Sequence, residues 1–194
     1  MFRRYRSKTP LFFCHPVHDT GPGSTFVLEV LIQAVETNAI EELFTKLKEG
    51  SAPGRFTAAN RLGKMGDKKA VDHLIAALDD EDDKVLDNVI FALGEIGDAR
   101  AVPHLVRMLG RSKSGRARKS AAKALGMLCS KDAVNALVRA LKDEDFKVRK
   151  SAARSLGQIG DRAAVPALKE AMSDPDYTVV KYVEDALDRL ESNI

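Results

Sequence analysis

Apolar positions recur along this chain at a nearly fixed step of 31 or 32 residues. One ladder is made of leucines, and two further ladders of apolar residues run in phase with it. The leucine ladder comprises Leu62, Leu93, Leu125, Leu156 and Leu187. Repetition at this period is typical of solenoids, in which each unit buries its apolar face only against its neighbours. The pattern therefore predicts an all-α solenoid of about five two-helix repeats.

The clearest copy of the unit is residues 131–161. Val134 and Leu137 belong to one apolar stripe at helical spacing, and Val148 and Leu156 belong to a second stripe. An acidic turn separates the two stripes. A Gly-Asp pair ends the unit, where Gly permits left-handed backbone and Asp can cap the next helix. We therefore expect each repeat to be a helical hairpin.

The repeat also predicts how the chain is organised. Residues 1–24 do not repeat and contain several prolines and glycines, which predicts an irregular tail. Residues 25–37 fit a degenerate capping segment, although their β-branched content also permits a strand. Residues 25–36 are apolar nearly all round, so either residues 1–24 fold over them or they are a contact surface, with self-association as a candidate. Residues 38–194 form the repeat domain, with units 38–67, 68–98, 99–130, 131–161 and 162–194.

The consensus AVxxLxxALxDEDxxVRxxAAxALGxIGD resembles the HEAT-like repeats first associated with phycobilisome lyases, over roughly residues 38 to 191. The resemblance implies a right-handed superhelix, with the first helix of each pair on the convex side and the second on the concave side. Leu86 and Val180 depart from it where the pattern has Arg. Cys129-Ser130 stands where the pattern has Gly-Asp.

The resemblance also implies a structural role for the recurrent arginine of the second helix. Arg55, Arg118 and Arg149 occupy this position. The resemblance implies that each ties neighbouring repeats together through the aspartate of a Gly-Asp pair, such as Asp98 or Asp161.

Helical geometry predicts which side chains face the concave surface. Counting from the buried Val148 at about 100° per residue, five positions of the second helix lie opposite its apolar stripe. In the third and fourth repeats these positions carry six cations and no acid, and a lysine of the fifth repeat extends the row. The same positions are mixed and partly aromatic in the first two repeats, with Phe56 and Phe91 among them. The predicted partner-binding strip is Arg116, Lys119, Lys123, Lys147, Lys150, Arg154 and Lys181.

We interpret the strip as the binding site of a non-catalytic scaffold for an acidic protein segment, centred on Lys119, Lys150 and Arg154. The simpler interpretation is a face kept soluble by lysines. Nucleic acid is an alternative partner for the same strip, and its affinity would fall steeply with salt. The resemblance adds a third hypothesis, a phycobilin lyase-like maturation factor, so lyase activity stays open. A deoxyhypusine hydroxylase is excluded because no His is followed by Glu.

Composition limits the remaining chemistry. The 31 basic and 28 acidic side chains nearly cancel, so local pattern matters more than net charge. Two cysteines, Cys14 and Cys129, form no disulfide framework, which favours a reducing cytoplasm. No apolar run is long enough for a bilayer, so no membrane partner is predicted. Cys14, His15, His18 and Asp19 have ligand chemistry but no second cluster, so we predict neither a metal site nor a cofactor.

Overall fold

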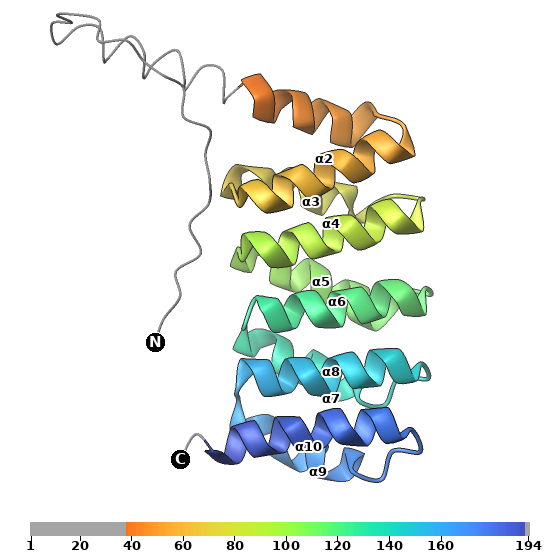
Figure 1. The fold of residues 1–194 in the computed structure, drawn as a ribbon, viewed down its shortest axis with the longest axis vertical. Helices are drawn as coiled ribbons and strands as arrows, with labels where there is room; N and C mark the ends of the chain where they lie inside the picture. Colours follow the sequence, from red (N-terminus) through yellow and green to blue (C-terminus); the bar gives the residue numbers. More distant parts are fainter. Residues whose placement is uncertain (1–37, 193–194) are drawn as a thin grey trace, which may run out of the picture. The chain divides into compact units, whose positions relative to one another are not determined.

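A computed structural model describes residues 38–192, and every regular element in this range is helical. The compact unit begins at Ile40, within a first helix over residues 38–49. Helices follow one another as hairpins that stack into two layers (Figure 1). This arrangement confirms the all-α solenoid predicted from the leucine ladder.

One layer contains the second helix of each repeat, and these helices pack side by side along the stack (Figure 1). They are α2 (Ala52–Met65), α4 (Asp83–Ile96), α6 (Gly115–Met127), α8 (Phe146–Ile159) and α10 (Tyr177–Ser192).

The other layer contains the first helix of each repeat. After the helix over residues 38–49, its members are α3 (Val71–Ala76), α5 (Val102–Arg111), α7 (Val134–Ala140) and α9 (Val165–Ala171). A short 3-10 turn leads into each of these four, and another follows α3: η1 (Lys68–Ala70), η2 (Ala77–Asp79), η3 (Ala99–Ala101), η4 (Lys131–Ala133) and η5 (Arg162–Ala164).

The leucine ladder forms the spine of the core. Leu62, Leu93, Leu125 and Leu156 are at most 1% exposed, because each lies between its own hairpin and the next. Leu187 of the last described repeat is partly exposed, since no further repeat covers it. Burial thus depends on stacking rather than on any single hairpin.

Local signals set the ends of the helices as the sequence predicts. Asp145 caps α8 by accepting a hydrogen bond from the Lys147 amide at 2.8 Å. Gly160 then ends α8 in the left-handed region, at φ 74°. Cys129 takes the equivalent position after α6 at φ 48°, a conformation that costs a non-glycine residue free energy.

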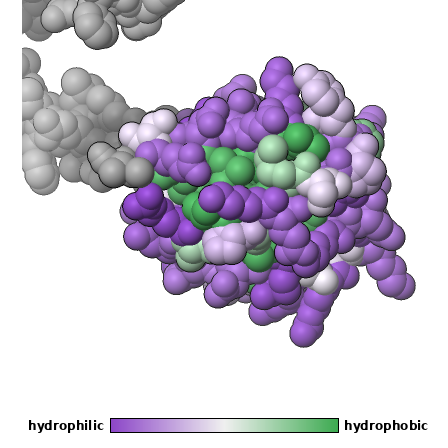
Figure 2. Space-filling view, turned by 90° about the horizontal axis from the view of Figure 1, so that it is seen from below, coloured by the Kyte–Doolittle hydropathy of each residue, from purple (hydrophilic) through white to green (hydrophobic). Residues whose placement is uncertain are grey.

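The end of the stack formed by α9 and α10 presents apolar side chains to solvent (Figure 2). Val165, Ala171 and Leu187 contribute partly buried surface there, and Met172 is exposed. Across the described residues, no helix is both long and apolar enough to cross a membrane. The segments predicted as an irregular tail and a capping segment lie outside the described residues.

Candidate functional site

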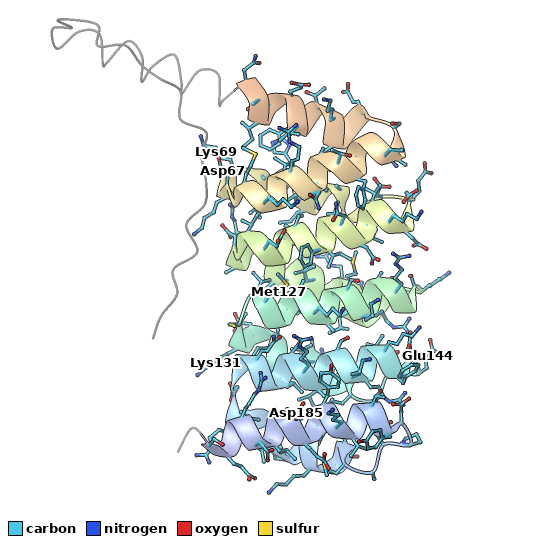
Figure 3. All side chains as sticks on the ribbon, viewed as in Figure 1. Asp67, Lys69, Met127, Lys131, Glu144 and Asp185 are labelled. Atoms are coloured by element: carbon cyan, nitrogen blue, oxygen red, sulfur yellow. The ribbon has the colours of Figure 1, made fainter. Side chains whose placement is uncertain are left out.

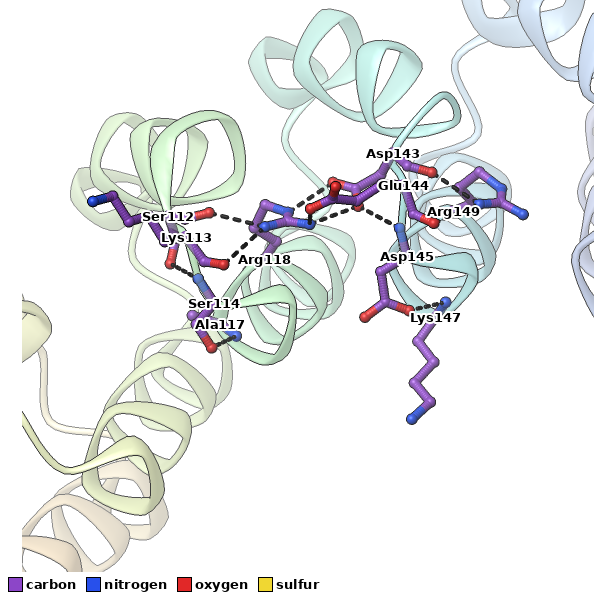
Figure 4. A network of polar contacts seen from close by, with 10 residues as sticks. All are labelled: Ser112, Lys113, Ser114, Ala117, Arg118, Asp143, Glu144, Asp145, Lys147 and Arg149. Carbon is purple, nitrogen blue, oxygen red and sulfur yellow. Dashed lines mark hydrogen bonds and ion pairs between the residues drawn. The ribbon is translucent and has the colours of Figure 1, made fainter.

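The recurrent arginines are structural, as predicted, but they bind a different set of acids. Arg149 donates from Nε and Nη2 to the two carboxylate oxygens of Asp174 at 2.6 and 2.9 Å. Arg118 holds Asp143 in the same way at 2.8 and 2.9 Å (Figure 4). Each acid lies in the loop between the two helices of the next repeat. Such bidentate pairs are geometrically specific as well as strong.

The first repeat carries a third copy of this arginine clamp. Arg55 donates to Asp80 from Nε and Nη2 at 2.6 and 2.9 Å, and from Nη1 to the Gly50 carbonyl of its own loop. Arg118 and Arg149 likewise donate to carbonyls of their own loops. One side chain therefore fixes two successive loops.

The expectation that the Gly-Asp aspartates are the partners is wrong. Arg149 lies near the start of α8, whereas Asp161 follows its last turn, roughly 18 Å away along the axis. Asp161 and Asp98 instead cap the following 3-10 turns, and Asp98 pairs with Arg100. The two kinds of acid thus serve opposite ends of the second helix.

The clamp is missing between the second and third repeats. Leu86 occupies the arginine position, and Ser112 occupies the acid position of the next loop. The equivalence of Ser112 and Asp143 is visible in their carbonyls, which accept from Arg118 and Arg149 respectively. Both members of the pair are therefore replaced together at this junction.

Four of the seven predicted strip residues converge on the layer of second helices. Lys119 and Lys123 project from α6, and Lys150 and Arg154 project from α8; we call these four the cation cluster. The pKa of Lys123 is lowered, first by partial burial among its neighbours and then by the positive charges of the other three. Lys123 therefore lies within the electrostatic influence of the other three.

The other three strip residues lie outside this cluster. Arg116 is not free, because its Nε donates to Asp87 of the preceding repeat. Lys147 lies 5.8 Å from the centre of the Phe146 ring, at cation–π distance. Lys181 is exposed on α10, one repeat further along.

Two acids that the strip prediction omitted lie on either side of the cation cluster. Asp87 on α4 binds Arg116 and accepts from the Ser120 hydroxyl at 2.9 Å. At the other end, Asp185 of α10 lines a small hollow together with Arg154 (Figure 3 labels Asp185). The helical count that found Arg154 places Asp185 at the same position of the fifth repeat, so the sequence did contain this signal.

A hollow of about 450 Å³ adjoins the cation cluster on the layer of second helices. Phe56 and Phe91 line one part of it and are 41% and 48% exposed. Lys119 and Lys123 line another part. Two large aromatic side chains and two lysines thus share one open cavity.

The remaining candidate chemistry offers little. Cys14, His15, His18 and Asp19 lie outside the described residues, and within residues 38–192 no group of acids, histidines and cysteines could hold a metal ion. His73 stacks on Phe44 with the ring centres 3.9 Å apart.

Comparison with solved structures places this solenoid among repeat proteins. The complex of CpcE and CpcF of phycocyanin lyase from Nostoc sp. PCC7120 matches with TM-score 0.70 and 26% identity, covering 94% of this chain and 71% of that chain. A designed armadillo repeat protein in complex with the peptide (KR)4 matches with TM-score 0.61 and 20% identity, covering 84% and 86%. The second likeness concerns the fold alone.

Comparison with curated proteins finds no match. The family model for HEAT repeats matches residues 40–125 and 110–188, which together span most of the chain. The resemblance stated from the sequence is therefore confirmed, and the chain belongs to the HEAT-repeat family.

Proposed function

We propose that this protein is a scaffold that binds an acidic segment of a partner protein on its layer of second helices, the side that the resemblance implies to be concave. The observation that carries the proposal is the cation cluster of Lys119, Lys123, Lys150 and Arg154. Within residues 38–192, none of these four side chains forms an ion pair. The arginines of the clamps, by contrast, are each saturated with acceptors.

Electrostatics supports an anionic ligand at this cluster. Like charges held close together raise the free energy of the protein. The pKa of Lys123 is lowered first by partial burial and then by the positive charges of Lys119, Arg154 and Lys150. A carboxylate placed among the four would remove the repulsion and add charge-assisted hydrogen bonds. Lys150 is oriented for this by the Phe146 and Tyr182 rings, whose centres lie 6.0 and 5.8 Å from its Nζ.

The extent of the cluster favours a short protein segment over nucleic acid. It lies on two neighbouring helices, α6 and α8, whose axes are about 8–10 Å apart. Asp185 of α10 lies beyond the end of the cluster formed by Arg154. A polyanionic backbone that continued along the stack would pass over the Asp185 carboxylate, whereas about three to four residues of extended peptide reach from α6 to α8. The similarity to a complex of two repeat proteins also supports a protein partner.

Charge reversal tests the proposal. The probes are a fluorescent peptide with six consecutive glutamates and a fluorescent single-stranded oligonucleotide, each titrated at low and near-physiological salt. The full chain should bind the peptide, and Lys119→Glu/Lys150→Glu/Arg154→Glu should abolish binding. A matched control reverses three exposed cations elsewhere, Arg107→Glu/Lys131→Glu/Lys169→Glu, and should bind as the wild type does.

The outcomes separate the partner classes. Loss of peptide binding in Lys119→Glu/Lys150→Glu/Arg154→Glu, but not in the control variant, supports the scaffold proposal. If the oligonucleotide binds more tightly than the peptide, with a steep salt dependence, and the same variant loses this binding, the function is nucleic-acid binding and not that of a protein scaffold. Equal binding by both triple variants would overturn the proposal, because any cationic surface would then suffice.

The phycocyanin lyase likeness favours a second candidate function, participation in attaching a bilin to a protein. This candidate places the enzymatic step in an assembly with other chains. A shift in the visible absorbance of an added bilin on mixing with the full chain would support it, and an unchanged spectrum would count against it.

A further inference from the structure

The hollow beside the cation cluster has a mixed lining that a purely acidic ligand would leave unused. Phe56 of α2 and Phe91 of α4 form its apolar part, and both are far more exposed than core side chains. Exposed aromatic side chains that line a cavity together are typical of binding sites.

The walls of this hollow are held in place. The side-chain amide of Asn88 donates to the Phe56 carbonyl at 2.8 Å and so ties α4 to α2 beside the cavity. Asp87 is occupied by Arg116 and Ser120 of α6, which ties α4 to α6. The same contacts neutralise the carboxylate nearest the hollow, so it does not repel an acidic ligand from the neighbouring lysines.

We propose that the partner segment carries a large apolar side chain, seated between Phe56 and Phe91, about three residues from the acids that the cation cluster binds. This inference rests on the proposed function and specifies its ligand. Its basis is that Lys119 and Lys123 line the same hollow as the two phenylalanines. One ligand segment can therefore reach both parts at once.

The spacing follows from the geometry of the stack. The apolar part lies on α2 and α4, and the cation cluster lies on α6 and α8. Neighbouring helices are separated by about 8–10 Å, and an extended chain advances about 3.3 Å per residue. A segment that crosses the helices therefore meets a new helix about every three residues. The preferred ligand has an apolar residue, then an acid about three residues away, then a second acid about three further.

Defined peptides test this arrangement by fluorescence anisotropy with the full chain. Two probes carry a phenylalanine and two glutamates at three-residue spacing in a glycine-serine background, one with the phenylalanine first and one with it last. A matched pair replaces the phenylalanine by serine. Burial of a phenylalanine side chain is strongly favourable. The affinity of the better phenylalanine probe should therefore be at least about tenfold higher than that of its serine counterpart.

Two protein variants separate the apolar contact from the charge contact. In Phe56→Ala/Phe91→Ala the advantage of the phenylalanine probe should disappear, leaving weak binding of both probes. Tyr177→Ala is the control, because Tyr177 is the most exposed aromatic side chain of the described residues and does not line the hollow. It should preserve the tenfold difference. The phenylalanines are substantially exposed, so thermal unfolding of the double variant should match the wild type.

Failure of this inference differs from failure of the proposed function. If phenylalanine and serine probes bind equally, and charge reversal at Lys119, Lys150 and Arg154 abolishes both, the inference is overturned and the acidic-segment scaffold stands. If none of the four peptides binds, both are overturned. Binding of an oligonucleotide that is lost in Phe56→Ala/Phe91→Ala would also overturn it, because the aromatic pair would then stack bases.

Discussion

Arg149 and Asp174 join two successive repeats through two parallel hydrogen bonds, Nε to Oδ2 at 2.6 Å and Nη2 to Oδ1 at 2.9 Å. Both side chains are largely removed from solvent. The same guanidinium donates to the Asp143 carbonyl of its own loop. Because each repeat of a solenoid contacts only its neighbours, such a clamp contributes directly to the free energy of one interface.

Removing the guanidinium should destabilise the protein. Arg149→Leu leaves the partly buried Asp174 carboxylate without its charged donor, which we expect to cost about 1–3 kcal/mol. Urea unfolding followed by circular dichroism measures the change. Arg149→Lys is the matched control and should cost less, since it keeps the charge but not the planar fork. Equal stability of Arg149→Leu and wild type would show that the clamp contributes nothing.

The clamps should also make the protein sensitive to acid. The hydrogen bonds from Arg149 lower the pKa of Asp174, and those from Arg55 lower the pKa of Asp80. A carboxyl whose pKa is lowered by folding stabilises the native state fully above its ordinary pKa of about 3.9. That contribution is lost as the pH falls through the folded-state pKa.

We therefore expect the melting temperature to fall as the pH is lowered below about 4. Asp174→Asn should be less stable than wild type at pH 7. Its melting temperature should fall less on acidification, because the variant lacks a carboxyl group that takes up a proton on unfolding. Differential scanning calorimetry between pH 7 and pH 3 measures both effects. Parallel curves for the two proteins would mean that Asp174 is not a source of the acid sensitivity.

The junction between the second and third repeats should be the weakest interface of the stack. Leu86 and Ser112 replace the arginine and its acid there. We predict that the repeats before this junction unfold at lower urea concentration than those after it. Hydrogen exchange followed by mass spectrometry should show faster exchange in α2 and α4 than in α6 and α8. Uniform exchange along the stack would contradict the prediction.

Introducing the missing arginine clamp tests whether its absence weakens the interface between the second and third repeats. Leu86→Arg/Ser112→Asp restores both partners, and we expect it to slow exchange in α4 and to bring the two unfolding transitions together. Each single substitution is a control that introduces one unpaired charge and should give no such gain. A double variant no better than the sum of its singles would show that the pair does not form.

The fold was predictable because each structural repeat of a solenoid corresponds to one repeat of the apolar pattern in the sequence. Leu93, Leu125 and Leu156 are buried as their spacing predicts. A capping aspartate and a turn glycine mark the two ends of α4 and of α8. The partner of Arg149 was not predictable from the period alone, because an acid follows this arginine at two offsets, as Asp161 and as Asp174. The length of α8 decides between them, since it places Asp161 at the far end of the helix.

The candidate site was only partly predictable. Counting positions on a helix puts Lys123 and Arg154 on the same predicted face, and the pKa of Lys123 is indeed lowered by partial burial first, then by the charge of Lys119 and then by that of Arg154. The count assigns no partners, however, so it could not reveal that Arg116 is paired with Asp87. The shared hollow of Phe56 and Lys123 also depends on how neighbouring helices pack, which no single repeat contains.

The close approach of α8 and α10 should make substitution of Gly157 destabilising. A Cβ added at Gly157 of α8 would lie 2.9 Å from both Cα and Cβ of Ala186 on α10, so the two helices would have to separate. We expect Gly157→Ala to destabilise the protein by about 1–3 kcal/mol, although alanine is the better helix former. Gly110→Ala is the matched control, because a Cβ at Gly110 of α5 meets nothing within 4 Å. That variant should be neutral or up to about 1 kcal/mol more stable in urea unfolding, and similar gains in both variants would refute the packing argument.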